Sequence, residues 1–258
     1  MGDAIVESVS EMPVSGNRNA GRIFKCILRL SLRIAKYVTI GFFGSTILVA
    51  ILFSFINPPL TPVMLKRAFV KNADGTRIGI HKDWVSYKKI SPHMIQAVVA
   101  SEDNRFRDHH GFDMQAIKKA ADYNKKHRRK RGASTISQQV AKNVFLWPAR
   151  TWIRKGFEVY FTFLIETIWS KKRIMVVYLN VIETGNGIYG VEAASRKYFN
   201  KPALKLTRGE SALIAACLPN PRKRNPARPT PYLLRRQAKI MDLMRKIGPL
   251  EFGKKSGK

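Results

Sequence analysis

The chain has 258 residues, with 47 lysines and arginines against 17 aspartates and glutamates, and a formal net charge of +30 at pH 7. Its hydrophobic content of 45% is ordinary for a folded protein and excludes wholesale disorder. So large a positive excess predicts a polyanionic partner, such as nucleic acid, anionic lipid head groups or a phosphorylated substrate.

The first predicted element is a stretch without charges, YVTIGFFGSTILVAILFSFI, at residues 37–56. About 20 apolar residues match the hydrocarbon core of a bilayer, which is roughly 30 Å thick. A buried helix of a soluble domain and a cleaved signal peptide are the alternatives. The late start and the sequence NPPLTP that follows favour an uncleaved signal anchor.

The charges before this segment predict its orientation. No acid lies between Glu11 and the span, and the basic residues there are Arg18, Arg22, Lys25, Arg29, Arg33 and Lys36. The positive-inside rule therefore places the N-terminus in the cytoplasm and everything after Asn57 outside it. From Arg22 onward these cations recur at helical spacing, which predicts a juxtamembrane helix on anionic lipid.

The remainder of the chain is predicted to be one α-rich domain. A Ser-Pro start signal at Ser91 opens the helical pattern, and Thr207 followed by Glu210 is typical of a capping box. The sequences NPPLTP and NADGTRIG favour a linker before it. The expected organisation is a disordered cytoplasmic tail at 1–20, a basic segment and anchor at 21–56, a linker with short extended pieces at 57–90, the α-rich domain at 91–248 and a basic tail at 249–258.

A candidate acid lies in VVASEDNRFRDHHGFD, residues 98–113. Glu102 follows apolar helical residues, so its carboxyl is expected to be partly desolvated. Desolvation raises a carboxyl pKa and suits a general base or acid. A solvated glutamate in the last helical turn is the alternative. Phe106, one turn later, and the turn HHG favour the functional interpretation.

Two polar segments follow. RGASTISQQVAKNVFL crowds hydrogen-bonding groups and one cation onto a helix start, which suits a sugar: Ser134, Thr135, Ser137, Gln138, Gln139, Lys142 and Asn143. An N-cap with a polar helix face is the alternative. ARTWIRKGFEVYF supplies Arg150, Arg154, Lys155 and a second acid, Glu158. Cations near an acid suit a pyrophosphate leaving group, and a surface salt-bridge network is the alternative.

The run KKHRRKR at residues 125–131 is the densest basic cluster. A nucleic-acid patch is the general alternative for such a run. On the outer side of a membrane, a mobile basic loop that lies over the substrate cleft and touches lipid phosphates is favoured, and no nucleic-acid partner is expected.

Several motifs together resemble the peptidoglycan glycosyltransferase family (glycosyltransferase family 51), whose lysozyme-like domain also occurs in bifunctional penicillin-binding proteins. EDNRFRDHHG fits E-D-x-x-F-x-x-H-x-G, and RKGFE fits R-K-x-x-E. GASTISQQVAKN fits G-x-S-T-I-T-Q-Q-x-x-K-N, with Ser137 for the usual threonine. The fourth and fifth blocks are IMVVYLNVIETGNGIYGVEAASRKYF and LTRGESALIAACLPNPRKRNP. The departures are Val176 for a common glutamate and Thr162 for a common alanine.

The resemblance covers about Ile90 to Pro229 and implies a mainly α, lysozyme-like glycosyltransferase domain with a smaller membrane-proximal jaw region, preceded by one transmembrane helix. The chain ends at Lys258, soon after the fifth block. This favours the monofunctional, membrane-anchored members of the family, without a transpeptidase domain.

The resemblance also implies a reaction. Glu102 would deprotonate the 4-hydroxyl of lipid II N-acetylglucosamine, which attacks a lipid-linked glycan strand, forms a β-1,4 linkage and releases undecaprenyl pyrophosphate. Lys142, Arg150 and Lys155 would stabilise the pyrophosphate, and Glu158 would assist the leaving group or position the cations. A divalent cation, Mg²⁺ or Mn²⁺, is a candidate cofactor that would help to stabilise the pyrophosphate, and no organic cofactor is expected. The other implied substrate contacts are Asp103, Phe106, His109, Ser134, Thr135, Gln138, Gln139, Asn143 and Arg154.

The implied location is the bacterial cell inner membrane, crossed once, with the catalytic domain periplasmic and other cell-wall synthesis and division proteins as partners. Two rival functions stay open. A lysozyme-like muramidase or lytic transglycosylase would share the fold and a catalytic glutamate, but its uncharged leaving group has no use for the cations. A non-enzymatic scaffold on anionic lipid would explain the charge and the anchor, but not the five motif blocks.

Overall fold

The computed structural model describes residues 16–71, 75, 77–149, 151–250 and 252. The chain divides into two compact units, Met1–Val49 and Ala50–Lys258. Helix α1 (Gly16–Phe55) begins in the first unit and ends in the second. Its segment Arg22–Phe55 is, among the described residues, the one long and apolar enough to cross a membrane, and it contains all but the last residue of the predicted span at 37–56. The predicted tail at 1–20 overlaps the first turn of this helix.

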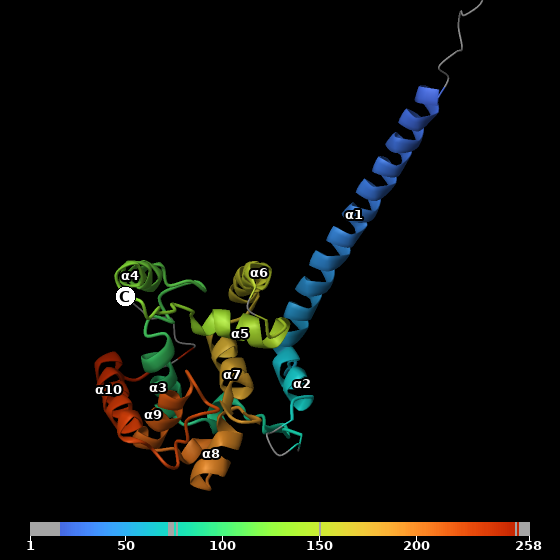
Figure 1. Ribbon diagram of the computed structural model, residues 1–258. Coiled ribbons are helices and arrows are strands. Elements are labelled where there is room, and N and C mark those ends of the chain that lie inside the picture. The colour runs from blue at the N-terminus through green and yellow to red at the C-terminus, as the bar shows by residue number, and fades with distance from the viewer. Residues whose placement is uncertain (1–15, 72–74, 76, 150, 251, 253–258) are drawn as a thin grey trace, which may run out of the picture. The chain divides into compact units, whose positions relative to one another are not determined.

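The second unit is mainly α-helical, as predicted, and Figure 1 shows its helices. Its elements are α2 (Pro62–Ala68), β1 (His81–Lys82), η1 (Tyr87–Lys89), α3 (Pro92–Glu102), α4 (Met114–Lys126), α5 (Ile136–Phe145), α6 (Trp152–Ile168), α7 (Lys171–Val181), β2 (Glu183–Gly185), β3 (Ile188–Tyr189), α8 (Val191–Phe199), η2 (Ala203–Lys205), α9 (Arg208–Cys217) and α10 (Pro231–Ile247). Strand β3 pairs with β1 in parallel and with β2 in antiparallel orientation.

The helix starts are set by local side chains. Thr207 and Glu210 form the predicted capping box at α9, in which each side chain accepts from the other residue's backbone N–H. Ser91 accepts from the backbone of His93 at the start of α3. The linker at 57–90 contains a helix that its proline-rich sequence did not predict. Thr61 caps α2, and the proline that follows suits a first helical turn.

Two groups of helices form the core. In one, α3, α9 and α10 pack against each other, and in the other α5 packs between α6 and α7. The buried face of α3 runs from Met94 to Ala100, and α7 is buried from Ile174 to Val181. The C-terminal end of α3 lies near α5, because Gln139 donates to Glu102 and the backbone N–H of Ile136 donates to Asp103.

The last turn of α1 is fastened within the second unit. Trp169 donates from Nε1 to the carbonyl of Ala50 at 2.7 Å. The guanidinium of Arg173 donates to the carbonyls of Phe53 and Ile56, at 2.8 Å and 2.6 Å. The final carbonyls of a helix have no partner within the helix and carry partial negative charge. A cation there donates hydrogen bonds to them and offsets that charge.

Candidate active site

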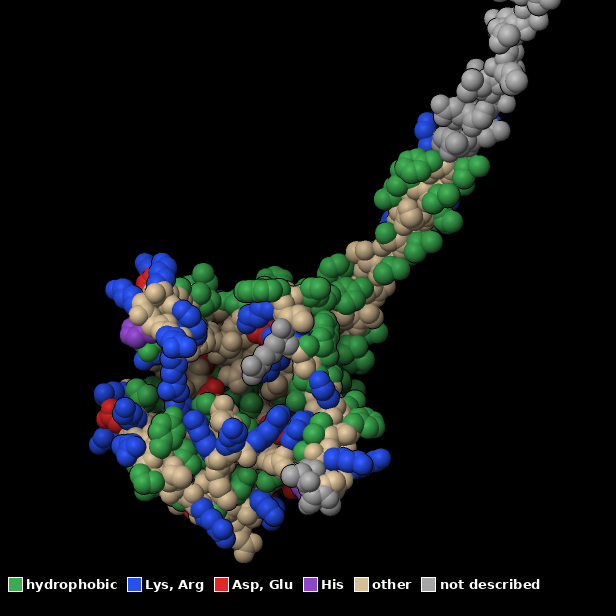
Figure 2. Space-filling model, viewed as in Figure 1, with side chains coloured by type: hydrophobic (Ala, Val, Ile, Leu, Met, Phe, Trp, Pro, Cys, Tyr) green, Lys and Arg blue, Asp and Glu red, His purple; other side chains and the backbone are tan. Residues whose placement is uncertain are grey.

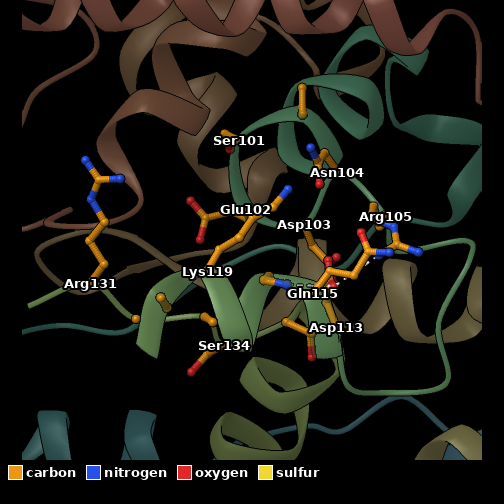
Figure 3. Close-up of a pocket in the computed structure, with 16 residues that line it drawn as sticks. Ser101, Glu102, Asp103, Asn104, Arg105, Asp113, Gln115, Lys119, Arg131 and Ser134 are labelled. Carbon is orange, nitrogen blue, oxygen red and sulfur yellow. Dashed lines mark hydrogen bonds and ion pairs between the residues drawn. The ribbon is translucent and has the colours of Figure 1, made fainter. Parts of the chain in front are cut away.

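One cavity is lined by Glu102, and a second is lined by its hydrogen-bond partner Gln139. The first, of about 410 Å³, is lined by the end of α3, by α4 and by the loop before α5. Figure 3 shows Glu102 in it together with Lys119, Arg131 and Ser134, which reach the cavity from other elements. The second, of about 560 Å³, is lined by residues that include Gln139. Gln139 donates from Nε2 to Oε2 of Glu102 at 3.0 Å, so this hydrogen bond links the walls of the two cavities.

The environment of Glu102 matches the predicted desolvation. Burial raises the pKa of this carboxyl. The hydrogen bond from Gln139 and the positive charges of Arg236 and Lys142 partly oppose that shift, while the negative charge of Asp103 adds to it. A carboxyl with a raised pKa that opens onto a cavity is suited to accept a proton from a bound hydroxyl.

Asp103 joins the elements around Glu102. Its side chain is 2% exposed, and Oδ1 lies 2.9 Å from Nε2 of His109. Its other oxygen accepts from the backbone N–H of Ile136 at 3.0 Å. The end of α3, the HHG turn and the start of α5 are thus tied together by one carboxylate. Asp103 also lines the first cavity, and its predicted contact with substrate stays a prediction.

Replacing Asp103 with alanine is expected to lower the free energy of unfolding by about 1–3 kcal/mol, because a buried N–H loses its acceptor. Denaturant unfolding of the detergent-solubilised protein measures this. Asp108→Ala is the matched control, since the Asp108 side chain is 62% exposed in a weak ion pair. Equal losses in both variants would contradict the assignment.

Phe106 and His109, which were predicted to contact substrate, lie inside the protein. Phe106 has no exposed surface, and the ammonium of Lys171 lies 4.5 Å from its ring centroid. The turn that follows requires a glycine. Gly111 has φ +88°, and a Cβ there would come within 2.8 Å of Thr162. These residues support the loop that follows Glu102, and neither Phe106 nor His109 lines either cavity.

The polar segment at the start of α5 divides between capping and cavity lining. Thr135 and Gln138 form a capping box, and the Thr135 hydroxyl also donates to the carbonyl of Gly111 at 2.6 Å. Ser137 is fully buried and donates to Glu166. The N-cap alternative therefore accounts for Thr135 and Gln138, and their predicted contact with substrate stays a prediction.

The rest of the segment faces the cavities. Ser134 lines the first cavity, while Gln139, Lys142 and Asn143 line the second. Burial lowers the pKa of Lys142, and the negative charge of Glu158 opposes this shift. The charges of Arg154 and Lys155 add to the lowering. A cluster of cationic side chains at a cavity wall is suited to bind an anionic group.

Glu158 is buried and paired with cations. It accepts from Arg154 Nη1 at 2.6 Å and from the ammonium of Lys155. Arg154 lines the second cavity, whereas Glu158 does not. Of the two roles considered for Glu158, the geometry favours positioning the cations. Arg150 lies outside the described residues, so its predicted role stays a prediction.

Several cavity residues were absent from the predicted site. Glu183 lines the second cavity and accepts from Arg222 at 2.9–3.1 Å, and Nε of Arg67 lies 3.7 Å from its Oε1. The one acid in the sequence VIETGNG could have indicated Glu183 as a site residue. Arg131, the last residue of the basic run, lines the first cavity with its guanidinium 3.7 Å from the Tyr123 ring centroid. Figure 2 shows how widely Lys and Arg side chains spread over this face of the second unit.

A metal site was also considered. The described residues include no group of three or more His, Cys, Asp or Glu side chains placed to hold a metal ion. Both oxygens of Glu158 are already occupied by cations. A divalent cation would therefore depend on oxygens of the substrate diphosphate, and it stays a prediction.

Residues 71–245 match the family model described as Transglycosylase. The chain belongs to the transglycosylase family. It is 56% identical over 223 residues to a biosynthetic peptidoglycan transglycosylase of Bacteroides thetaiotaomicron, and the aligned residues cover 85% of this chain and 90% of that protein. It is 48% identical over 228 residues to the Escherichia coli protein of the same name, covering 88% and 93%. The Bdellovibrio bacteriovorus relative is 54% identical over 201 residues, covering 78% and 80%.

These matches confirm the resemblance seen in the motif blocks. They support peptidoglycan glycosyltransferase activity. The roles of individual residues rest on the geometry described above.

Proposed function

We propose that this transglycosylase extends glycan strands by joining lipid II, held in the first cavity, to a lipid-linked strand whose diphosphate lies in the second. The observation that carries the proposal is the position of Glu102. Glu102 lines a cavity with hydroxyl and amide groups, such as Ser134, and its hydrogen-bond partner Gln139 lines a second cavity with Lys142 and Arg154. An acceptor hydroxyl needs a base within reach, and an anionic leaving group needs cations nearby.

In the proposed reaction, Glu102 takes the proton of the acceptor 4-hydroxyl. That oxygen forms a bond to C1 of the donor N-acetylmuramic acid as the bond from C1 to the phosphate oxygen breaks. Attack from the opposite face inverts the α linkage to β-1,4. The electron pair leaves with undecaprenyl pyrophosphate, whose growing charge Lys142 and Arg154 offset, with Arg150 and Lys155 as further expected cations. Glu102 then releases its proton to solvent.

The cations of the second cavity argue against hydrolysis of the finished wall. A glycosidic leaving group is uncharged, so it gains nothing from Lys142 and Arg154 and needs an acid to protonate it. Glu158, the other candidate acid, is buried, is paired with Arg154 and Lys155, and does not line the second cavity. In a muramidase mechanism Glu102 would have to act as the acid, and the cations of the second cavity would have no role.

The anchor and one face of α6 fit a membrane-bound substrate. We place the protein in the bacterial inner membrane with the N-terminus in the cytoplasm, on the flanking positive charges. On α6, the side chains of Trp152, Ile153, Val159 and Phe163 are 91%, 71%, 45% and 66% exposed. Exposed apolar residues of this size along one helix mark an interaction surface, and an aromatic-rich face beside basic residues suits the membrane interface.

The double variant Trp152→Ser with Phe163→Ser is expected to raise KM for lipid II in liposomes several-fold and to leave kcat nearly unchanged, because the face aids access rather than chemistry. Steady-state polymerisation at varied lipid II density measures this. Leu234→Ser, on an exposed position of α10, is the matched control. A KM equal to that of the unmodified protein would show that this face of α6 does not contact the membrane.

The proposed function is tested with labelled lipid II and detergent-solubilised protein. Polymer that lysozyme digests, with no clearing of isolated cell walls, is the expected result. Clearing of walls would identify a muramidase or lytic enzyme. If neither reaction occurs over a range of detergents and divalent cations, the scaffold alternative explains the protein better.

A further inference from the structure

A buried tyrosine stands behind the proposed base. Tyr178 on α7 has no exposed surface, and its hydroxyl lies 3.3 Å from Oε1 of Gln139. Gln139, on α5, donates from Nε2 to Oε2 of Glu102 at 3.0 Å. The three side chains form a chain of two hydrogen bonds that starts inside the protein and ends at the carboxylate.

The chemistry of its ends fixes the direction of this chain. An ionised carboxylate only accepts hydrogen bonds, so Gln139 must turn its NH₂ group to Glu102 and its carbonyl oxygen to Tyr178. The tyrosine must then donate. Burial, with the negative charges of Glu102 and Asp103, raises the pKa of Tyr178 well above its ordinary value. The phenol therefore keeps its proton and selects which end of the amide faces the base.

We propose that Tyr178 and Gln139 are positioning residues that hold Glu102 oriented and ionised for proton abstraction, an inference that rests on the proposed role of Glu102. Without the phenol, the amide can turn over, and a carbonyl facing Glu102 is compatible only with the protonated carboxyl. A hydrogen bond to the ionised form lowers a carboxyl pKa, whereas one that requires the proton raises it. Removing the phenol hydroxyl therefore raises the pH at which the base becomes active.

Other charged groups face Glu102 and remain in place when the tyrosine is changed. They come from several elements and comprise Asp103 at the end of α3, Lys142 on α5, Arg236 on α10, and Lys119 and Arg131, which line the same cavity. Because Tyr178→Phe alters none of them, a shift of the pH profile reports the amide hydrogen bond.

The test is the pH dependence of kcat/KM for lipid II polymerisation by the full-length protein in detergent. The acid limb is the part of this profile in which kcat/KM rises with pH as the base loses its proton. In Tyr178→Phe it is expected to move to higher pH. The rate on that limb should be roughly 3- to 10-fold lower and should approach the unmodified value on the plateau. Gln139→Glu places a second carboxylate in the position of the amide NH₂ group and should move the limb further in the same direction.

An unchanged acid limb in folded Tyr178→Phe and Gln139→Glu would overturn the proposal, as would an equal loss at every pH, which indicates packing alone. If melting shows that Tyr178→Phe does not fold, Gln139→Met carries the same test, because Gln139 is only half-buried at the cavity wall. Glu102→Gln is measured in parallel. If Glu102→Gln stays active, Glu102 is not the base, and the proposed positioning role has no basis. If Glu102→Gln is inactive but the pH profiles of the other variants coincide with that of the unmodified protein, only the positioning role is wrong.

Discussion

Replacing Glu102 with glutamine is expected to reduce the rate of glycan polymerisation by at least about 10²-fold, because a positioned general base contributes about 10²–10⁴-fold. The amide has nearly the shape of the carboxyl but cannot accept the proton of the acceptor hydroxyl. Burial raises the pKa of Glu102, so the carboxylate has the basicity that this step requires. Lipid II polymerisation at saturating substrate measures the loss.

The loss must be separated from a loss of folding. Asp242→Asn is a suitable control, since Asp242 is partly exposed on α10 and pairs with Arg245 and Lys246. It should polymerise at the unmodified rate, and Glu102→Gln should retain the thermal unfolding midpoint of the unmodified protein. A Glu102→Gln variant that is folded and within a few-fold of normal activity would exclude Glu102 as the base.

The second large effect is expected at Lys142. Replacing it with methionine keeps the apolar stem but removes the ammonium that faces the second cavity, and kcat should fall by about 10²–10³-fold. The reason is that, in the proposed reaction, charge on the departing pyrophosphate grows in the transition state while the diphosphate lies in this cavity. Single-turnover polymerisation separates this loss from a change in product release.

Inhibition by undecaprenyl pyrophosphate provides an independent readout for Lys142→Met. Its inhibition constant should rise, because the product carries the charge that the ammonium binds. Lys205→Met, on the exposed η2 turn outside both cavities, is the matched control and should change neither quantity. If Lys142→Met lowered kcat but bound the product normally, the ammonium would not contact the diphosphate.

The sequence predicted the parts of this protein that depend on local pattern. The charge-free segment predicted a membrane-spanning helix, and Thr207 with Glu210 predicted the start of α9, because both signals lie within one element. Glu102 was identified by its apolar neighbours and by motif order. The desolvation of its carboxyl was likewise predicted from the helix that carries it.

Tertiary contacts decided the rest. Tyr178 lies 39 residues from Gln139 in the chain, so its hydrogen bond leaves no local pattern. Phe106 was expected at the cleft but is buried. The sequence of a motif does not show whether its aromatic side chain faces a ligand or the core. Glu183 and Arg222 line the second cavity together and are hydrogen-bonded, although 39 residues separate them in the chain.

The most direct test of the mechanism counts products. Detergent-solubilised protein is incubated with lipid II labelled in both sugar and lipid, and new glycosidic bonds are compared with released undecaprenyl pyrophosphate. We predict one β-1,4 bond for each undecaprenyl pyrophosphate released, with both products lost together in Glu102→Gln. Release of the lipid pyrophosphate without bond formation, or α-linked products, would contradict an inverting transfer with Glu102 as its base.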